Sequence, residues 1–573
     1  MDLKAPWLNA YGNVARTIEY PDKTLCEQVL SVCERKPACT ALAFMGRNIS
    51  YGHMAKMIEK TAKAFAASGI KKGDFVTLCM PNIPQTVYCF YALNMLGAVA
   101  SLIHPLSAEG EILYYLRQVQ GGVIVTLDQF VSKVLEVHKE YPLDKIIVAD
   151  IADELPVIKS VAYRFISGKK NPKPRYNEIV VKWTDFISKG DKFDGIYNSG
   201  MHKDDTAVIL FSGGTTGVSK GIELSSYNFN ALAYQTAEMS QCNVEDSSML
   251  AAMPMFHGFG LGVCVHTLLA LGGVSILVPR FNVEEYAKLI KKCRPNFIAG
   301  VPTLFEAIAN STYLDGVNLD CLKGVFSGGD SLAPDLKKKI DAFLKSHGAT
   351  VSVREGYGTT ECVTASCLTP YINEKEGSIG LPFPDTYYKI CELGTTSEVD
   401  YGQFGEICIS GPTVMKGYLN HEDETANTLE IHEDGRTWLR TGDLGSMDSE
   451  GYVYFKQRIK RMIITSGYNV YPSQIEAIFN DHEAVLLSCV IGVPDPHKIQ
   501  KVKAYVVLDE GYQPSDELKE KLYEHCKRHI AKYAMPYDIE FRDSLPKTKI
   551  GKIAYGELEK EAIEKENDNA VMV

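Results

Sequence analysis

The sequence predicts an α/β protein built from several packed units, and three observations lead to this. Its 573 residues exceed the length that one compact core supports. Short β-branched runs alternate with helix-like segments at 75–78, 122–125, 145–148 and 207–210. Such alternation is typical of βαβ units whose parallel strands are buried on both faces. The pattern then changes twice, so the chain contains more than one kind of unit.

These two changes divide the second half of the chain. Between about 370 and 457, short strands are separated by glycine turns, which predicts an antiparallel, barrel-like unit. After Lys460 a new α/β pattern begins, with strands expected at 484–491 and 503–508. The predicted domains are an N-terminal domain over 1–459 and a C-terminal domain over 460–573.

Composition and charge exclude several classes of protein. With 45% hydrophobic and 23% charged residues the chain is globular, and its net charge of −11 argues against a nucleic-acid partner. The 15 cysteines never form a C-x-x-C pair, so neither a disulfide framework nor a zinc site is expected. The first residues lack the pattern of a signal peptide. We therefore predict a cytoplasmic protein, with a membrane surface as its one further location.

Two segments bear on contact with membranes. The 19 uncharged residues of 260–278 are divided by Gly272 and Gly273, which predicts a buried helix followed by a buried strand. Residues 155–176 contain six basic residues and no acid, with apolar residues at helical spacing. A basic amphipathic helix of this kind binds anionic membranes, so peripheral contact through 157–175 is one interpretation. A solvated surface helix followed by a loop is the other.

A glycine-rich stretch at 212–221 follows the strand expected at 207–210 and precedes a polar, helix-like segment. Its glycines let backbone N–H groups converge on an anion, its hydroxyls add donors, and its lysine adds a positive charge. This predicts a triphosphate cradle, although the G-K-[ST] ending of a Walker loop is absent. The residues expected to contact phosphate are Ser212, Gly213, Gly214, Thr215, Thr216, Gly217 and Lys220.

Other motifs supply the remaining parts of a nucleotide site. Tyr357, flanked by Gly356 and Gly358, can lie flat against a base, and the nearby Glu361 carboxylate can hold Mg²⁺. The segment 438–445 places Asp443 on a turn, where its carboxylate can accept ribose hydroxyls. Two basic blocks follow, at 458–467 and 546–552.

In this order and spacing, the motifs resemble the adenylate-forming superfamily of acyl-CoA synthetases, peptide-synthetase adenylation domains and luciferase. The resemblance runs from about residue 20 to about 555 and is greatest to AMP-forming fatty-acid and aryl-acid CoA ligases. It implies a large N-terminal domain of two α/β subdomains plus a distorted β-barrel. A small, mobile C-terminal α+β lid would turn about a hinge at Lys460. In the implied reaction a carboxylate attacks the α-phosphate of ATP, and a thiol then displaces AMP.

The resemblance also implies roles for individual residues. Lys552 would bridge the carboxylate and the α-phosphate, Thr216 and Glu361 would be associated with Mg²⁺, and His257 would lie at the carboxylate end of the acid. Asp443 and Arg458 would contact the ribose and Tyr357 the adenine. Further positions implied are Gly329, Asp330, Gly356, Gly358, Thr359 and Thr360 at the nucleotide, Phe256, His257, Phe259, Gly300 and Gly328 at the acyl pocket, and Gly467 at the arm of CoA.

The leading interpretation is an ATP-dependent ligase that joins a medium- or long-chain fatty acid to CoA. Small residues at Gly260, Gly262 and Gly300 are expected to leave room for an apolar chain. Ile464 stands where luciferase carries a second catalytic lysine, which argues against an oxygenase. The alternatives are an aryl or other cyclic carboxylate as the acid, a carrier protein as the acceptor, and a nucleotide-binding protein without catalysis.

Overall fold

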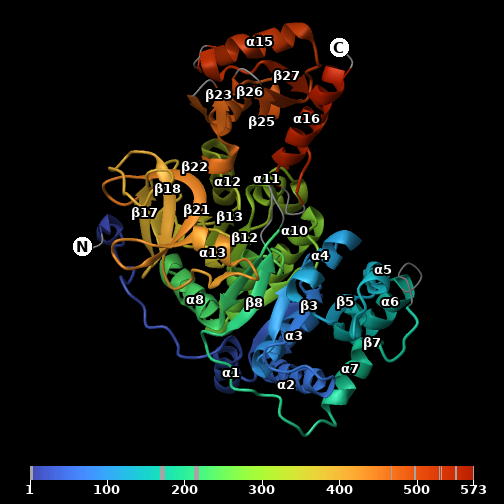
Figure 1. Ribbon diagram of the computed structural model, residues 1–573. Coiled ribbons are helices and arrows are strands. Elements are labelled where there is room, and N and C mark those ends of the chain that lie inside the picture. The colour runs from blue at the N-terminus through green and yellow to red at the C-terminus, as the bar shows by residue number, and fades with distance from the viewer. Residues whose placement is uncertain are drawn as a thin grey trace.

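The computed structural model describes residues 4–167, 174–211, 219–465, 468–495, 498–527, 529–530, 532–548 and 552–571. A large N-terminal domain contains three sheets, and a small C-terminal domain sits on one end of it (Figure 1). This is the two-domain α/β architecture that the sequence predicts. Among the described residues, no helix combines the length and the apolar character needed to cross a membrane.

The first sheet contains eight strands in the order β19-β9-β8-β4-β3-β5-β6-β7. Strands β3 to β8 run parallel, whereas β9 and β19 are antiparallel additions at one edge. The four strands predicted from β-branched runs are β3, β5, β6 and β8. The strands are β3 (Phe75–Cys79), β4 (Val99–Leu102), β5 (Val123–Leu127), β6 (Lys145–Ala149), β7 (Val180–Lys182), β8 (Thr206–Phe211), β9 (Gly221–Ser225) and β19 (Gly417–Tyr418). The helices of this part of the chain are α1 (Leu25–Arg35), α2 (Tyr51–Ala67), α3 (Pro84–Leu96), α4 (Glu109–Val119), α5 (Val131–Glu140), α6 (Val157–Ser167), α7 (Trp183–Gly190) and α8 (Ser226–Ser240).

One local prediction in this sheet is wrong. The glycine-rich stretch leads into strand β9 and only then into α8, not directly into a helix. The reason is that Gly221–Ser225 pairs antiparallel with β8, so the stretch links two neighbouring strands.

The second sheet contains nine strands in the order β16-β15-β14-β13-β12-β10-β11-β1-β2. The uncharged segment at 260–278 is buried in it, as predicted. Its first part is a π-helix (Phe259–His266) that continues into α9 (Thr267–Leu271), and its second part is β11. The strands are β1 (Thr40–Phe44), β2 (Arg47–Ser50), β10 (Ser248–Ala251), β11 (Val274–Leu277), β12 (Phe297–Gly300), β13 (Gly324–Gly328), β14 (Val353–Tyr357), β15 (Cys367–Leu368) and β16 (Leu381–Pro382). The helices beside it are α10 (Val283–Cys293), α11 (Pro302–Ala309) and α12 (Pro334–Ser346).

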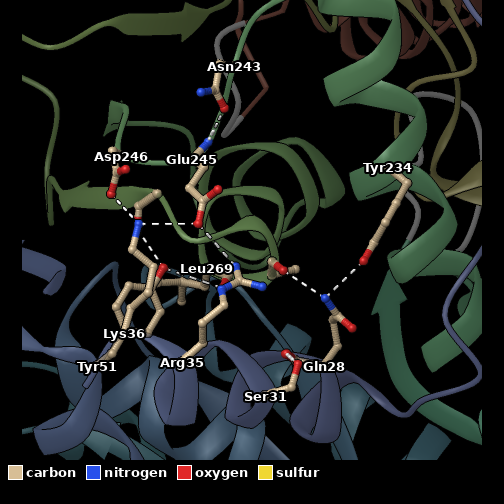
Figure 2. Close-up of polar contacts among 12 residues, drawn as sticks. Gln28, Ser31, Arg35, Lys36, Tyr51, Tyr234, Asn243, Glu245, Asp246 and Leu269 are labelled. Atoms are coloured by element: carbon tan, nitrogen blue, oxygen red, sulfur yellow. Dashed lines mark hydrogen bonds and ion pairs between the residues drawn. The ribbon is translucent and has the colours of Figure 1, made fainter. Parts of the chain in front are cut away.

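Helix α1 is tied to the second half of the domain by polar contacts (Figure 2). The Gln28 amide donates to the carbonyl of Ala270 at 2.8 Å, and the Lys36 ammonium forms ion pairs with Glu245 and Asp246. The Thr24 hydroxyl and the Glu27 carboxylate form a capping box that starts the helix. Residues more than 200 positions later in the chain therefore pack against this first helix.

The third sheet is antiparallel, as predicted for this region, in the order β17-β18-β21-β20 with β22 beside β21. Its longest strand, β21, is irregular where it faces β22, between Leu444 and Gly445. The elements are β17 (Tyr387–Cys391), β18 (Gly405–Ser410), α13 (Glu422–Thr428), β20 (Leu429–Ile431), β21 (Thr437–Met447) and β22 (Val453–Arg458).

The C-terminal domain has a sheet and a hydrophobic core of its own. Strands β25 and β26 form its longest antiparallel pair and correspond to the predicted strands at 484–491 and 503–508. Phe479, Val490 and Leu522 are among the side chains buried between this sheet and its helices. The elements are β23 (Ile463–Thr465), β24 (Tyr468–Val470), α14 (Pro472–Asn480), β25 (Val485–Asp495), β26 (Ile499–Leu508), α15 (Asp516–Lys527), β27 (Asp538–Phe541) and α16 (Tyr555–Val571).

A buried arginine joins the second sheet to the end of α8. The Arg354 guanidinium, on β14, donates to the carbonyls of Met239, Ser240 and Thr369 at 2.7–2.9 Å. The first two carbonyls belong to the last turn of α8, where the helix dipole favours a cation. Burial lowers the pKa of Arg354 to about 10.

We expect Arg354→Met to lower the free energy of unfolding by about 3 kcal/mol, because three buried carbonyls lose their donor. Thermal and urea unfolding of the full chain measure the loss. Arg294→Met is the control, since Arg294 pairs with Asp320 on the exposed surface and such pairs contribute less than about 1 kcal/mol. Equal losses in the two variants would contradict the role given to Arg354.

Candidate active site

The carboxyl ends of three neighbouring parallel strands define the site. Gly300 of β12 lies opposite Ser327 of β13, and Gly328 of β13 lies opposite Gly356 of β14. In open α/β sheets, ligands bind at this edge of the strands. Residues predicted for the adenine and for the acyl pocket therefore lie at the same edge of this sheet.

The loop after β13 is held by a buried carboxylate. Gly329 has a φ of +82°, which favours glycine, and Asp330 follows it. The Leu332 N–H donates to Glu355 Oε1 at 3.0 Å. Burial raises the pKa of Glu355 to about 7. Glu355 begins the motif that contains Gly356 and Tyr357, but no feature of the sequence assigned it a role.

Asp443 is the centre of a buried polar group. Tyr357 Oη donates to Asp443 Oδ2 at 2.6 Å, and Arg458 Nη1 lies 3.0 Å from Asp443 Oδ1. Arg458 also donates to the Thr441 carbonyl at 3.1 Å. Burial raises the pKa of Asp443, and the nearby Arg458 opposes that rise. The structure thus brings together the three residues predicted for adenine and ribose.

The position of Asp443 differs from the prediction. It lies within strand β21, not on a turn, and directly opposite Arg458 of β22. Gly442 before it has a φ of +69°, and in the ladder to β18 the three residues 441–443 lie opposite the single residue Ile407. A bulged strand of this kind redirects one side chain into a site while the pairing continues.

A second group surrounds Glu361. Tyr418 Oη donates to Glu361 Oε1 at 3.0 Å. The Lys220 ammonium lies 4.7 Å from the centre of the Tyr418 ring and forms an ion pair with Glu424. Lys220 and Glu361 therefore both contact Tyr418, so the structure brings these two predicted site residues close together.

The glycine-rich stretch itself lies largely outside the described residues. This holds for six of the predicted phosphate contacts, Ser212, Gly213, Gly214, Thr215, Thr216 and Gly217, and for Gly467. Its described end is anchored, because Tyr114 Oη of α4 donates to the Ser219 carbonyl at 2.7 Å. The predicted Thr359 and Thr360 lie in the turn that follows β14.

The C-terminal domain delivers Lys552 to this site. Two hydrogen bonds hold Lys552 beside Thr548: the Thr548 N–H donates to the Lys552 carbonyl at 2.6 Å, and the Lys552 N–H donates to Thr548 Oγ1 at 3.1 Å. Burial lowers the pKa of Lys552, and the carboxylates of Asp330 and Asp443 oppose this effect. The ammonium therefore lies within electrostatic reach of both predicted nucleotide carboxylates.

His257 faces Lys552 from the other domain. Its pKa is lowered to about 4 by burial and by the charge of Lys552, so the ring is neutral at pH 7. Its Nδ1 accepts the Phe259 N–H at 3.1 Å, which leaves the proton on Nε2. The Phe256 ring next to it packs against His104, with the ring centres 4.3 Å apart.

The glycines around His257 do not leave the open space that we predicted. A Cβ at Gly260 would lie 2.1 Å from the Pro254 carbonyl oxygen, and one at Gly262 would lie 2.6 Å from the Leu232 side chain. A Cβ at Gly300 would lie 2.9 Å from Leu304. These glycines permit close packing of the π-helix and the strand ends, and π-helices often occur at functional sites. At Gly328 the nearest side chain is the predicted pocket residue Phe259, at 3.6 Å.

Lys460 lies between two arginines that belong to different domains. Arg458 is bound to Asp443 of the N-terminal domain. Arg461 forms an ion pair with Glu476 on α14 and lies 4.8 Å from the Tyr555 ring, both in the C-terminal domain. Lys460 itself is exposed and close enough to Lys220 to lower the pKa of that lysine.

The described residues contain no cluster of three or more histidine, cysteine or acidic side chains that could hold a metal. Glu361 is thus a single carboxylate beside the predicted phosphate contacts. That arrangement fits Mg²⁺, which takes one or two protein carboxylates and completes its shell with phosphate oxygens and water.

Taken together, the strand ends and the converging charged side chains define a two-domain nucleotide-binding enzyme. The sequence profile of AMP-binding enzymes matches residues 29–419, and that of the AMP-binding enzyme C-terminal domain matches residues 474–552. The chain belongs to this family of AMP-binding enzymes. Within the family it groups with the AMP-forming acyl-CoA synthetases, which are ligases, as its motifs indicated.

Similar proteins extend over the whole chain. The long-chain-fatty-acid–CoA ligase of Bacillus subtilis (strain 168) is 33% identical over 576 residues, covering 99% of both chains. In fold, the ATP-bound RpMatB-BxBclM chimera B1 has a TM-score of 0.81 at 24% identity, covering 94% of this chain and 98% of its own. The anthranilate CoA ligase AuaEII, solved with anthranoyl-AMP, has a TM-score of 0.79 at 22% identity, covering 97% and 99%.

Four residues of the site were missed from the sequence: Tyr114, Glu355, Tyr418 and Glu424. Tyr418 reaches the site because the short strand β19 pairs with β9, almost 200 residues earlier. Strand pairing between distant segments leaves no periodic signal in a sequence. The one available hint was a tyrosine after Lys416 and Gly417, in a segment with turn residues.

We expect Tyr418→Phe to lower kcat/KM for ATP about tenfold, because a hydrogen bond to a charged group contributes about 1.5 kcal/mol. Steady-state release of AMP measures this. Tyr401→Phe, at an exposed tyrosine, is the control and should leave the rate unchanged. A normal rate for Tyr418→Phe would mean that Glu361 needs no such support.

We also expect the His257 ring to titrate near pH 4, and Lys552→Met to raise that pKa while burial keeps it below 6.5. Between about pH 4 and pH 6.5, the unfolded chain binds more protons than the folded chain. His257 therefore makes the free energy of unfolding rise with pH across this interval. NMR spectra of histidine-labelled protein, assigned through the signal lost in His257→Gln, measure both values. If the pKa of His257 is unchanged in Lys552→Met, the charge of Lys552 does not act on the His257 ring.

Proposed function

We propose that this enzyme joins a medium- or long-chain fatty acid to CoA through an acyl-adenylate, at the expense of ATP. The observation that carries the proposal is the position of Lys552 beside Asp330, Asp443 and His257, in a chain that belongs to the AMP-binding enzymes. The nature of the acid rests on relatives that are long-chain-fatty-acid–CoA ligases along their whole length. Such an enzyme acts in fatty-acid metabolism.

The first half of the reaction brings two anions together. A carboxylate oxygen attacks the α-phosphorus of ATP, and the bond from phosphorus to the pyrophosphate oxygen breaks. Lys552 offsets the repulsion and the charge that develops at phosphorus, and its position close to the site costs little reorganisation at that moment. Asp443 and Tyr357 orient the nucleoside, so that the α-phosphate meets the acid.

His257 is proposed to orient the acid. Because the ring is neutral at pH 7, it would donate one hydrogen bond from Nε2 to the carboxylate without neutralising its charge. A protonated ring would pair with the nucleophile and lower its reactivity. The packed aromatic rings of Phe256 and Phe259 then direct the acyl chain away from the phosphates.

Mg²⁺ would be held by Glu361 and Thr216 and would supply positive charge to the phosphate oxygens. Tyr418 keeps the Glu361 carboxylate oriented, and Lys220 provides a charge on the same side. Glu424, which pairs with Lys220, would release it to a bound polyphosphate.

For the second half we propose that the C-terminal domain turns about Lys460, so that the thiol of CoA reaches the adenylate from the side that Lys552 leaves. The ties of Arg458 to one domain and of Arg461 to the other support a junction between them, and hence domains of 1–459 and 460–573. This rotation of the C-terminal domain would leave the ion pairs of Arg458 and Arg461 intact.

Two alternatives remain. The fold is shared with an anthranilate CoA ligase, which favours an aryl acid as the second candidate substrate. A carrier protein could also replace CoA as the acceptor.

The cytoplasmic location stays a prediction, supported by fifteen free cysteines, which are typical of a reducing compartment.

The deciding experiment is AMP release from ATP over a panel of acids, with and without CoA. The panel contains fatty acids from C6 to C18, benzoates, cinnamates and a bile acid. Turnover that needs CoA and peaks among the fatty acids is the expected result. A peak among the aryl acids would replace the substrate, and pyrophosphate exchange without thioester would replace the acceptor.

Lys552→Ala should slow adenylate formation about 10²–10³-fold, since it removes a preorganised charge. Thioester formation from supplied acyl-adenylate should stay close to normal. Lys547→Ala is a matched control, because Lys547 is an exposed lysine that pairs with Ile553, the residue after Lys552. Equal loss in both half-reactions would contradict the role of Lys552.

Lys460→Pro should impair thioester formation at least about tenfold while adenylate formation continues, because proline fixes φ at the proposed hinge. Single-turnover assays of each half-reaction measure this. Lys460→Ala, which keeps the backbone free, separates the hinge from the charge. If adenylation is lost equally, Lys460 does not act as a hinge.

A further inference from the structure

Helix α6 (Val157–Ser167) is oriented against the usual rule for surface helices. Its apolar side chains point outward, with Val157 80%, Ile158 86%, Val161 67% and Phe165 73% exposed. Ser160 and Tyr163 are half-buried on the opposite side. A helix adapted to water on its outer face turns its apolar residues toward the core. The interpretation of this segment as an ordinary solvated helix therefore does not fit.

Polar contacts hold α6 in this orientation. Arg164 forms an ion pair with Asp153 at 2.6 Å, on the short turn that precedes the helix. Tyr163 Oη accepts a hydrogen bond from the Gln129 amide at 3.0 Å, and the Lys159 ammonium donates to the Met45 carbonyl at 2.8 Å. The side that faces the protein is thus built from polar groups, and the apolar side is left facing outward.

Positive charge accompanies this apolar face. The segment 155–176 has six basic residues and no acid, in a chain with a net charge of −11. The carboxylates of Asp150 and Asp153 both pair with Arg164 and offset its charge. The carbonyl that Lys159 binds does not offset its charge, and Arg175 is exposed just beyond the helix.

We propose that the outer face of α6 binds the surface of an anionic membrane, with the helix lying in the plane of the interface. The exposed apolar side chains would enter the boundary between headgroups and acyl chains, and the exposed Lys159 and Arg175 would meet lipid phosphates. A second copy of the chain is a poorer occupant, because a twofold contact would set this basic face against itself. Helix α6 lies at the outer edge of the N-terminal domain, away from the C-terminal domain (Figure 1).

The proposal is independent of the acid that the enzyme activates, and its test needs no catalysis. The full-length protein is sedimented with phosphatidylcholine vesicles that contain or lack phosphatidylglycerol, at low and at high salt. We expect binding that requires the anionic lipid and weakens with salt. Failure of the unmodified protein to bind anionic vesicles would overturn the proposal.

The variant Val157→Gln/Val161→Gln/Phe165→Gln should reduce the bound fraction by about tenfold or more, since it removes the inserted apolar groups. Glutamine keeps the helix propensity high. The matched control replaces Ile196, Ile372 and Ile431 by glutamine, because these isoleucines are 69–83% exposed elsewhere on the surface. Equal binding by the two triple variants would remove α6 from the interaction. AMP release with a short, water-soluble acid should be unchanged in both.

A fluorescent probe locates the contact. Phe165→Trp should show a blue-shifted emission with anionic vesicles, whereas Ile196→Trp should not. The native Trp7, Trp183 and Trp438 are all buried and give a constant background. Light scattering covers the other occupant: self-association that depends on α6 without vesicle binding would assign the face to a second copy and overturn the proposal.

Discussion

The pairing of Asp443 with Arg458 is the interaction on which the site depends. It joins two neighbouring strands of the antiparallel sheet and fixes a buried carboxylate at the proposed nucleotide site. The same arginine stands two residues before Lys460, so the proposed hinge follows directly on the proposed nucleotide site. The C-terminal domain is thereby linked to the site through a short segment that Asp443 anchors.

The electrostatics of the site follow from burial between two domains. Asp443 and His257 lie in the N-terminal domain, and Lys552 lies in the C-terminal domain. Burial and the charge of Lys552 lower the pKa of His257, whereas the carboxylates of Asp330 and Asp443 favour the charged form of Lys552. In a medium of low dielectric constant these interactions are stronger than in water. The charges of the site therefore come from both domains, because Lys552 of the C-terminal domain interacts with Asp443 and His257 of the N-terminal domain.

Small residues and apolar residues serve here in ways that composition does not reveal. Gly260 and Gly262 allow the backbone to pack closely rather than opening a pocket. On the surface, Val157 and Phe165 form an exposed face that the protein holds outward through Arg164 and Tyr163. In both places the sequence shows which residue types are present. Whether they are crowded or exposed depends on the neighbouring elements, which only the fold supplies.

The sequence by itself determined the α/β class, the change to antiparallel strands after about residue 370, and the family, because periodicity and local motifs are properties of short segments. It also gave Tyr357, Asp443 and Arg458 as parts of one site. Only the tertiary structure decided that Asp443 lies in a bulged strand and that Tyr418 donates a hydrogen bond to Glu361. These facts depend on pairing between strands far apart in the chain, and such pairing is set by the packing of the whole domain.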